Sequence, residues 1–181
     1  MKIRKLYRIE SAHIVRNAFS QRCSHSYHGH SGVVEVFFKA GHLDDAGMIY
    51  DFGAMKNTVG AFIDMFDHSV HLWAGDDGEC IDFFQKNNER WVMLPVNPSA
   101  ENYCVLFRDC VNEILKESHF YNGCGEVICT GVRYHETATG YAESEETDPR
   151  KFSLKEIVFS PETLANTSTE LKEIIKKVCR G

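Results

Sequence analysis

The stretch "HGHSGVVEVFFKAG", residues 28–41, decides the fold of this chain. Valine and phenylalanine dominate its centre, as expected for a β-strand, and Gly41 ends the run. Residues 2–13, "KIRKLYRIESAH", predict a second strand, because their apolar residues keep to strand spacing. Between the two strands, residues 16–27 show no clear periodicity and predict a loop. We therefore expect two long antiparallel strands joined by a loop.

Two helices are predicted to follow these strands. The second helix begins at "NPSAEN", where Asn97 or Ser99 is the candidate cap and Pro98 suits the first turn, and it is predicted to end near "ESHFYNG". The apolar residues at helical spacing are Met55, Val59, Phe62, Ile63 and Phe66 in the first helix and Cys104, Phe107, Val111, Ile114 and Leu115 in the second. Each helix therefore has one apolar face that packs against a sheet.

The segment between and after the helices is read from its turn residues. Residues 71–97 are less regular and predict a long insertion, with a turn at "AGDDGE" and some helix near "CIDFFQKN". Glycines 123 and 125 introduce residues 126–144, which predict a strand, a turn around Thr139 and Gly140, and a return strand. This pair of strands is expected to join the same sheet.

The order of the predicted elements is ββ, αα, ββ, followed by an appendage. The appendage consists of a last strand at residues 151–160 and a short amphipathic helix at residues 168–179. This order favours the α+β class, with an antiparallel sheet that two helices cover on one face. We expect a single domain over residues 1–181, with a core at about residues 1–146 and a C-terminal extension at residues 147–181.

Composition and charge narrow the class of partner. The chain of 181 residues is 43% hydrophobic and 25% charged, which is typical of a globular protein, and it has a net charge of −6. That charge argues against a nucleic-acid partner and favours a small molecule. The N-terminus lacks the apolar region of a secretory signal, and no apolar run reaches the roughly 18 residues of a membrane helix. Seven scattered cysteines without a CxxC pair indicate reduced thiols, so we expect a cytoplasmic protein.

Three histidines are the candidate metal ligands. His28 and His30 lie two apart on a strand and therefore project to the same face, with Gly29 leaving room between them. His13 ends the neighbouring strand and supplies a third imidazole. Three histidines without a fourth protein ligand are typical of a catalytic zinc with an open position. The motif alone is weak, because a pair of strand histidines that only bond to the backbone fits it about as well.

Three further residues are candidates for proton transfer. Cys23 lies in the loop just before His28, where a nearby zinc ion and Arg22 would favour its thiolate. An inert loop cysteine is the competing interpretation. Asp67 and His68 put a carboxylate beside an imidazole at the end of the first helix, although electrostatics at a helix end would also explain them.

Two glutamates are candidates for binding a substrate. Glu136 ends a strand before a turn, where a carboxylate can accept two parallel hydrogen bonds from an amidine-like ring edge. Glu101 lies in the first turn of its helix, a position that the helix dipole also explains. Neither residue indicates a function without its context.

Taken together, these motifs resemble the 6-pyruvoyltetrahydropterin synthase family, particularly its bacterial branch of 6-carboxytetrahydropterin synthases. The resemblance runs from about residue 3 to residue 146. It is carried, in the family's order, by His13, Cys23, "HGH" at 28–30, "DFGAMK" at 51–56, "DH" at 67–68, "PSAEN" at 98–102 and "HET" at 135–137. Seven short motifs in the right order are far more specific than any one of them.

The resemblance implies the tunnelling fold, in which ββααββ subunits form a trimeric barrel and two trimers stack, with active sites between subunits. It implies Zn²⁺ as the cofactor, and it implies 7,8-dihydroneopterin triphosphate as the substrate. The implied roles are zinc binding by His13, His28 and His30, proton transfer by Cys23, Asp67 and His68, anchoring of the pterin ring by Glu136, and a place near that ring for Glu101.

Two alternatives stay open at the level of the sequence. Four residues separate Cys23 from His28, a spacing between those of the carboxy-type and pyruvoyl-type members of the family. The spacing therefore does not decide which reaction takes place. One reaction forms 6-carboxytetrahydropterin for queuosine-type synthesis, and the other is a simple loss of triphosphate. A non-catalytic pterin- or metal-binding protein is the third reading. Arg16 and Arg22 are candidates for binding the triphosphate.

Overall fold

The computed structural model describes residues 1–120, 125–144 and 148–180, and its strands form one seven-stranded sheet. The boundary expected at residue 146 and the glycine at position 123 lie outside these residues. Across the sheet the strands are β6 (Gly140–Glu143), β5 (Val127–Thr137), β2 (His28–Ala40), β1 (Ile3–His13), β3 (Ser69–Trp73), β4 (Trp91–Leu94) and β7 (Val158–Phe159). With its helices, this sheet confirms the α+β class.

The two long strands predicted from the sequence form the centre of the sheet. β1 and β2 pair antiparallel from Ile3 opposite Phe38 to His13 opposite His28. β2 also pairs antiparallel with β5, and β5 with β6, as expected for residues 126–144. Apolar residues on one face of these strands are buried, whereas the other face carries charged side chains. The pattern of alternation is therefore the reason why one face of the sheet is covered.

The prediction of a purely antiparallel sheet is wrong on one side of β1. β3 pairs parallel with β1 and with β4, and α3 (Gly78–Asn87) makes the crossover from β3 to β4. The helix predicted near "CIDFFQKN" is confirmed as α3. The segment of residues 71–97 as a whole is not an irregular insertion, because it interrupts the predicted ββααββ order with a β-α-β unit. The two strands are only five and four residues long, too short for a period to show in the sequence.

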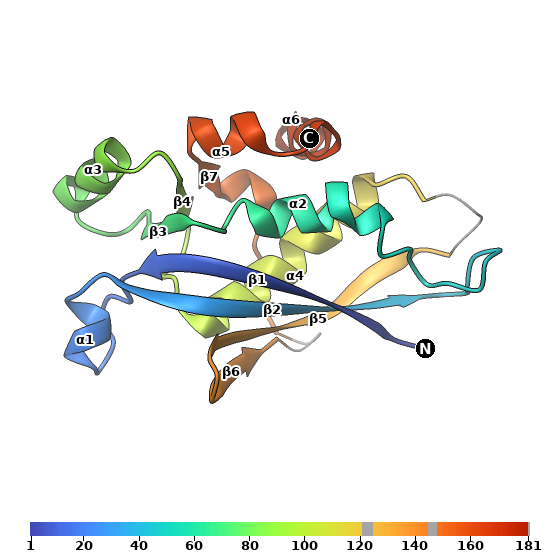
Figure 1. Ribbon diagram of the computed structural model, residues 1–181, viewed down its shortest axis with the longest axis horizontal. Coiled ribbons are helices and arrows are strands. Elements are labelled where there is room, and N and C mark those ends of the chain that lie inside the picture. The colour runs from blue at the N-terminus through green and yellow to red at the C-terminus, as the bar shows by residue number, and fades with distance from the viewer. Residues whose placement is uncertain (121–124, 145–147, 181) are drawn as a thin grey trace.

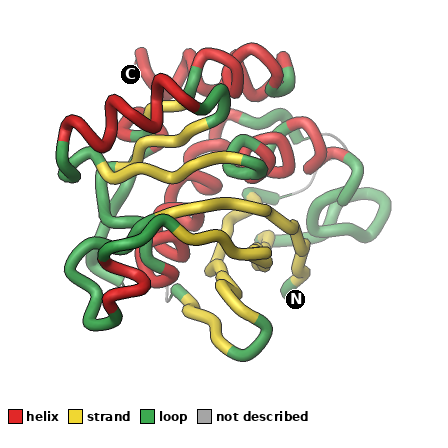
Figure 2. Tube along the Cα trace, turned by 60° about the vertical axis from the view of Figure 1, so that its left-hand side comes forward, coloured by secondary structure: helices red, strands yellow, loops and turns green. Residues whose placement is uncertain are grey.

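The helices lie mainly on one side of the sheet (Figure 1). α2, α4, α5 and α6 lie on that side, whereas α1 and α3 lie at the end of the molecule where β1 ends and β2 begins (Figure 1). The remaining helical elements are α1 (Gln21–Ser24), η1 (Ala54–Asn57), α2 (Val59–Asp64), α4 (Ala100–Glu117), η2 (Leu154–Glu156), α5 (Pro161–Asn166) and α6 (Thr169–Arg180). The two helices expected on one face are η1 with α2, and α4. A turned view shows the same layering (Figure 2).

The predicted apolar faces form the core between these helices and the sheet. All ten residues predicted for the two helical stripes are buried. The Ser99 side chain caps α4 by accepting a hydrogen bond from the Asn102 amide, so Ser99 rather than Asn97 is the cap. Pro98 precedes this cap and does not lie in the first turn. It turns the chain just ahead of the helix.

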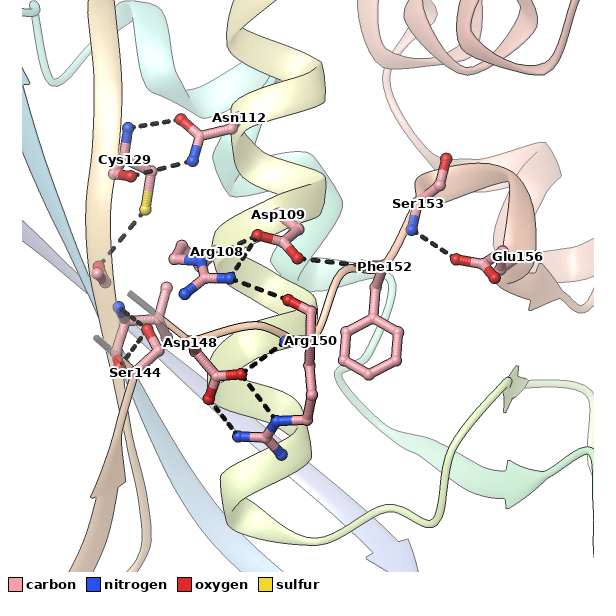
Figure 3. Close-up of polar contacts among 12 residues, drawn as sticks. Arg108, Asp109, Asn112, Cys129, Ser144, Asp148, Arg150, Phe152, Ser153 and Glu156 are labelled. Carbon is pink, nitrogen blue, oxygen red and sulfur yellow. Dashed lines mark hydrogen bonds and ion pairs between the residues drawn. The ribbon is translucent and has the colours of Figure 1, made fainter. Parts of the chain in front are cut away.

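The C-terminal extension is built into the same core. Arg108 and Asp109 of α4 bind the segment that contains Arg150 and Phe152: Arg108 Nη2 donates to the Arg150 carbonyl at 3.5 Å, and the Phe152 amide donates to Asp109 Oδ2 at 3.0 Å (Figure 3). Leu154 donates its amide to Glu113 Oε2 at 2.7 Å. Side chains of α4 thus provide acceptors and donors for a segment that has no strand partner there.

The last strand predicted at residues 151–160 is mostly wrong. Ser153 and Glu156 form a capping box around the 3₁₀ turn η2, and strand pairing is restricted to β7, which joins β4. Pro161 begins α5, and Ser160 is the cap of this helix. The predicted terminal helix is confirmed as α6.

Replacing Leu171 of α6 by alanine is expected to lower the free energy of unfolding by about 2–5 kcal/mol, because this side chain is fully buried in the core. Urea unfolding followed by circular dichroism measures the change. Arg180→Ala, at an exposed position of the same helix, is the matched control and should stay within about 0.5 kcal/mol. A value for Leu171→Ala as small as the control would show that α6 does not contribute to the core.

Within the described residues, no helix has both the length and the apolar character to cross a membrane. The six described cysteines are unpaired: Cys104, Cys110 and Cys129 are buried, Cys23 and Cys80 are half-buried, and Cys179 is exposed. Reduced thiols were expected from the sequence, and Cys124 lies outside the described residues.

Candidate active site

His13, His28 and His30 lie together at the ends of the two central strands. The pairing of His13 with His28 brings the rings into contact, with centroids 4.8 Å apart, and His30 lies 5.1 Å from His13 and 5.0 Å from His28. One nitrogen from each ring lies within 4.8 Å of the others. The structure thus brings the three predicted ligands to one point.

The donor atoms of this cluster suit a bound cation. Nε2 of His13 and Nε2 of His30 are buried and have no hydrogen-bond partner. Leaving such atoms unpaired costs about 1–3 kcal/mol each, which a metal ion at this point would offset. His28 Nδ1 donates to the Ser26 carbonyl at 3.0 Å, so its Nε2 keeps a free lone pair. The residues present therefore fit a zinc ion with an open position.

The charge state of the histidines favours metal binding as well. Burial, with smaller contributions from His28 and His30, lowers the pKa of His13 from 6.5 to about 3. Burial also lowers the pKa of His30, although the nearby Glu136 carboxylate opposes this shift. The rings of His13 and His30 are therefore neutral at pH 7, and their short distances to Glu136 are not ion pairs. Neutral imidazole is the form that binds a metal.

Glu136 comes close to this cluster from β5. Its Oε1 lies 3.5 Å from His13 Nε2 and 3.9 Å from His30 Nε2. A cavity of about 590 Å³ beside it is lined by Gly29, His30 and Glu136, together with side chains from the outer face of the sheet. The carboxylate is therefore placed at the edge of a hollow of a size that takes a small molecule.

A second layer of residues, which the sequence analysis missed, holds His13 in place. A hydrogen bond to the backbone of Pro98 orients the ring, and because Nε2 has no partner, Nδ1 makes this bond. The Tyr103 ring stacks against His13 with an interplanar angle of 18°. The Tyr103 hydroxyl donates to Nδ1 of the fully buried His71, whose Nε2 donates to the Phe66 carbonyl at 3.0 Å. The signal in the sequence that could have indicated Tyr103 is its position just after the predicted start of the second helix, at "NPSAEN".

The buried His71 predicts a pH-dependent stability of the metal-free protein. Burial lowers its pKa from 6.5 to about 4, so below pH 6.5 the unfolded chain takes up a proton that the folded chain does not. The free energy of unfolding is expected to fall between pH 6.5 and about 4, by on the order of 3 kcal/mol from this residue. Urea unfolding in chelator across this range measures the slope. His71→Gln should reduce the slope by the share of this one residue, because His13 and His30 contribute to it as well, and an equal slope in both proteins would contradict this assignment.

Asp67 and His68 form a pair, but the structure does not bring them to the three histidines. His68 Nδ1 donates to Asp67 Oδ2 at 2.8 Å, and Asp67 Oδ1 accepts the Glu10 amide at 2.7 Å. The two adjacent side chains thus bond to each other, and His68 adopts a left-handed φ of 50°. His68 is exposed and lines an open cleft of about 570 Å³ with Glu10 and Ala12. These two β1 residues point to the opposite face of the sheet from His13.

Cys23 and Glu101 lie on segments that adjoin the cluster. Cys23 is half-buried in the short helix α1, within the loop that leaves the cluster at His13 and returns to it at His28. Glu101 is exposed in the first turn of α4, two residues before Tyr103. Their predicted roles stay predictions. Arg16 is engaged by Asp76 at 2.8 Å, which makes it a weaker candidate for the triphosphate than the sequence indicates.

Comparison with known proteins agrees with this geometry. The family model for 6-pyruvoyl tetrahydropterin synthase matches residues 2–147. A 6-carboxy-5,6,7,8-tetrahydropterin synthase of Helicobacter pylori strain J99 is 42% identical over 144 residues, covering 80% of this chain and 72% of that protein. The Aquifex aeolicus protein of the same name is 33% identical over 123 residues, covering 66% of this chain and 74% of its own.

Solved structures resemble the fold at lower sequence identity. An uncharacterized protein of Wolinella succinogenes has a TM-score of 0.57 at 18% identity, covering 80% of this chain and 97% of that chain. The 6-pyruvoyl tetrahydropterin synthase of Caenorhabditis elegans has a TM-score of 0.54 at 17% identity, covering 80% and 94%. With the family match over most of its length, this chain belongs to the 6-pyruvoyl tetrahydropterin synthase family.

Proposed function

We propose that this protein is a zinc-dependent 6-carboxy-5,6,7,8-tetrahydropterin synthase. It would convert 7,8-dihydroneopterin triphosphate and water to 6-carboxytetrahydropterin, acetaldehyde and triphosphate, a lyase-type step that feeds queuosine and other 7-deazapurines. The observation that carries the proposal is the cluster of three histidines with two buried, unpartnered Nε2 atoms. The name of the 42% identical Helicobacter pylori relative, 6-carboxy-5,6,7,8-tetrahydropterin synthase, supports the choice of reaction.

His13, His28 and His30 would hold the zinc ion. When bound, zinc supplies Lewis acidity, which stabilises negative charge that develops on a neighbouring substrate oxygen. The bonds from His28 to Ser26 and from His13 to Pro98 fix both rings so that the free nitrogens face one point. The ligand set is therefore preorganised before the substrate arrives.

Cys23 would act as the base in its thiolate form and remove a proton from a carbon of the substrate side chain. The Asp67 carboxylate holds the Nδ1 proton of His68, which leaves His68 Nε2 free to return or relay a proton. Because the pair lies on the other face of the sheet from His13, we propose that it serves the active site of a neighbouring subunit. A trimer, or two stacked trimers, of the tunnelling fold would bring the Asp67–His68 pair of one subunit to the three histidines of its neighbour.

Glu136 would orient the substrate by accepting two parallel hydrogen bonds from the pterin ring. Its position 3.9 Å from His30 Nε2, at the edge of the 590 Å³ cavity, supports a pterin ring bound close to the three histidines. Glu101 would lie near the same ring. A cytoplasmic location and a single domain with a C-terminal extension complete the proposal as predictions from the sequence.

The test is to incubate the zinc-loaded protein with 7,8-dihydroneopterin triphosphate and to identify every product by mass, with His28→Ala as the control. Formation of acetaldehyde together with 6-carboxytetrahydropterin supports the proposal. A product that keeps the three-carbon side chain after loss of triphosphate identifies a pyruvoyl-type synthase instead. Binding of the substrate without turnover identifies a non-catalytic pterin-binding protein.

A further inference from the structure

Two hydrogen bonds within the loop of residues 14–27 hold the backbone at Cys23 and at Ser24. The Val15 amide donates to the Cys23 carbonyl at 2.8 Å, and Arg16 Nη1 donates to the Ser24 carbonyl at 3.3 Å. The position of α1, and with it the position of the thiol, therefore depends on where Val15 and Arg16 are fixed. The contacts of Arg16 with the rest of the protein therefore help to set the position of Cys23.

Arg16 is fixed from outside the loop by residues 74–97, which connect β3 to α4. Its Nε donates to Asp76 Oδ1 at 2.8 Å, and the Asp76 side chain is only 5% exposed. The Arg16 amide donates to Asn97 Oδ1 at 3.1 Å, and Asn97 Nδ2 donates back to the Arg16 carbonyl. A buried carboxylate and a two-point amide contact leave this part of the loop little freedom.

α3 holds the other end of the loop. The Phe84 ring lies against the Tyr27 ring with centroids 3.9 Å apart, directly before the ligand His28. Cys80, on the same helix, approaches both the Tyr27 hydroxyl at 3.9 Å and Arg16 Nη2 at 3.7 Å. One helix thus contacts both ends of the loop that carries Cys23, and α1 and α3 lie at the same end of the molecule (Figure 1).

We propose that residues 74–97 position Cys23 for proton abstraction by clamping the loop of residues 14–27, with Asp76 and Phe84 as positioning residues. This inference rests on the function proposed above, because Cys23 is a base only in that reaction. The β-α-β unit that interrupts the ββααββ order then has a role in the active site. It sets the reach and the reactivity of the thiol without touching the substrate.

The experiment compares wild type with Asp76→Ala and Phe84→Ala in the zinc-loaded protein. Asp82→Ala and Phe83→Ala are the matched controls, because both residues are exposed on α3, the helix that follows Asp76 and contains Phe84. We measure hydrogen exchange of residues 14–27, the pH profile of iodoacetamide alkylation at Cys23 located by mass spectrometry, zinc content, kcat and KM. In both test variants we expect exchange at least ten times faster, a shifted alkylation profile and a kcat at least ten times lower. Zinc content and KM should change less than about twofold.

The outcomes separate this inference from the proposed function. Test variants that match their controls in exchange and in alkylation overturn the clamp. A loosened loop with unchanged kcat overturns it too and leaves the proposed function standing. If wild type makes no product from 7,8-dihydroneopterin triphosphate, the proposed function fails, and the alkylation profiles still decide whether Asp76 and Phe84 position the thiol. The use of two variants at separate contacts guards against misfolding of either one.

Discussion

Replacing His28 by alanine is expected to lower the zinc content from about one ion per chain to less than roughly a tenth of that. The remaining His13 and His30 supply two ligands, and two imidazoles bind zinc much more weakly than three. The loss of product formation should follow the loss of metal. Atomic emission analysis of protein purified without chelator measures the ion, and unfolding in urea checks that the fold persists.

The matched control for this experiment is His119→Ala, which removes a histidine from an exposed position. It should keep zinc and activity at the wild-type level. Full zinc occupancy in His28→Ala would contradict the ligand assignment. Equal zinc loss in both variants would point to a general effect of losing an imidazole rather than to this cluster.

Replacing Cys23 by alanine is expected to reduce turnover by about 10²–10⁴-fold, the usual contribution of a positioned base. Zinc content and pterin affinity should be preserved, because the thiol is separate from the three histidine ligands and from Glu136. Steady-state rates with 7,8-dihydroneopterin triphosphate and titration of the pterin by fluorescence measure the two effects independently.

Cys179→Ala serves as the control for Cys23, because it removes a thiol from the exposed end of α6. Its activity should equal that of wild type. If Cys23→Ala turned over substrate at the same rate as Cys179→Ala, then Cys23 would have no part in the mechanism and another group would have to take the proton.

The centre of the fold and the cluster of three histidines could be predicted because their signals are local. The strand-forming residues of β1 and β2 predict two long strands by their composition and spacing. The spacing of His28 and His30 predicts that both side chains lie on the same face of the sheet. The pairing of His13 with His28 follows once the two strands are joined by a single loop. A periodic pattern over eleven or more residues is strong enough to survive its context.

The parallel strands β3 and β4 could not be predicted, because each is too short for a period to show in the sequence. Each is a short apolar run whose place in the sheet is set by pairing with β1 and by the crossover of α3. Nothing in five residues specifies such a partner. The turn η2 was a different case, because the "SLKE" of residues 153–156 is a readable capping box that was taken for part of a strand.

The candidate site could be predicted residue by residue but not as an arrangement. Glu136 lies at the histidines as the motif order indicated, whereas Asp67 and His68 lie on the opposite face of the sheet. Which face a residue takes after a helix depends on the strand that follows, and here that strand was β3. The roles of Tyr103 and His71 behind His13 depend on the same unpredicted pairing.

The pairing of His13 with His28 has a consequence for how such a chain tolerates insertions and deletions. His13 and His28 are paired residues of β1 and β2, so the hydrogen bonds of the sheet, and not the connection between the strands, set their separation. Lengthening or shortening that connection by a residue is expected to move the Cys23 thiol, whereas the separation of His13 and His28 along the paired strands stays the same. The distance between these two histidines and the position of the thiol can therefore change independently of each other.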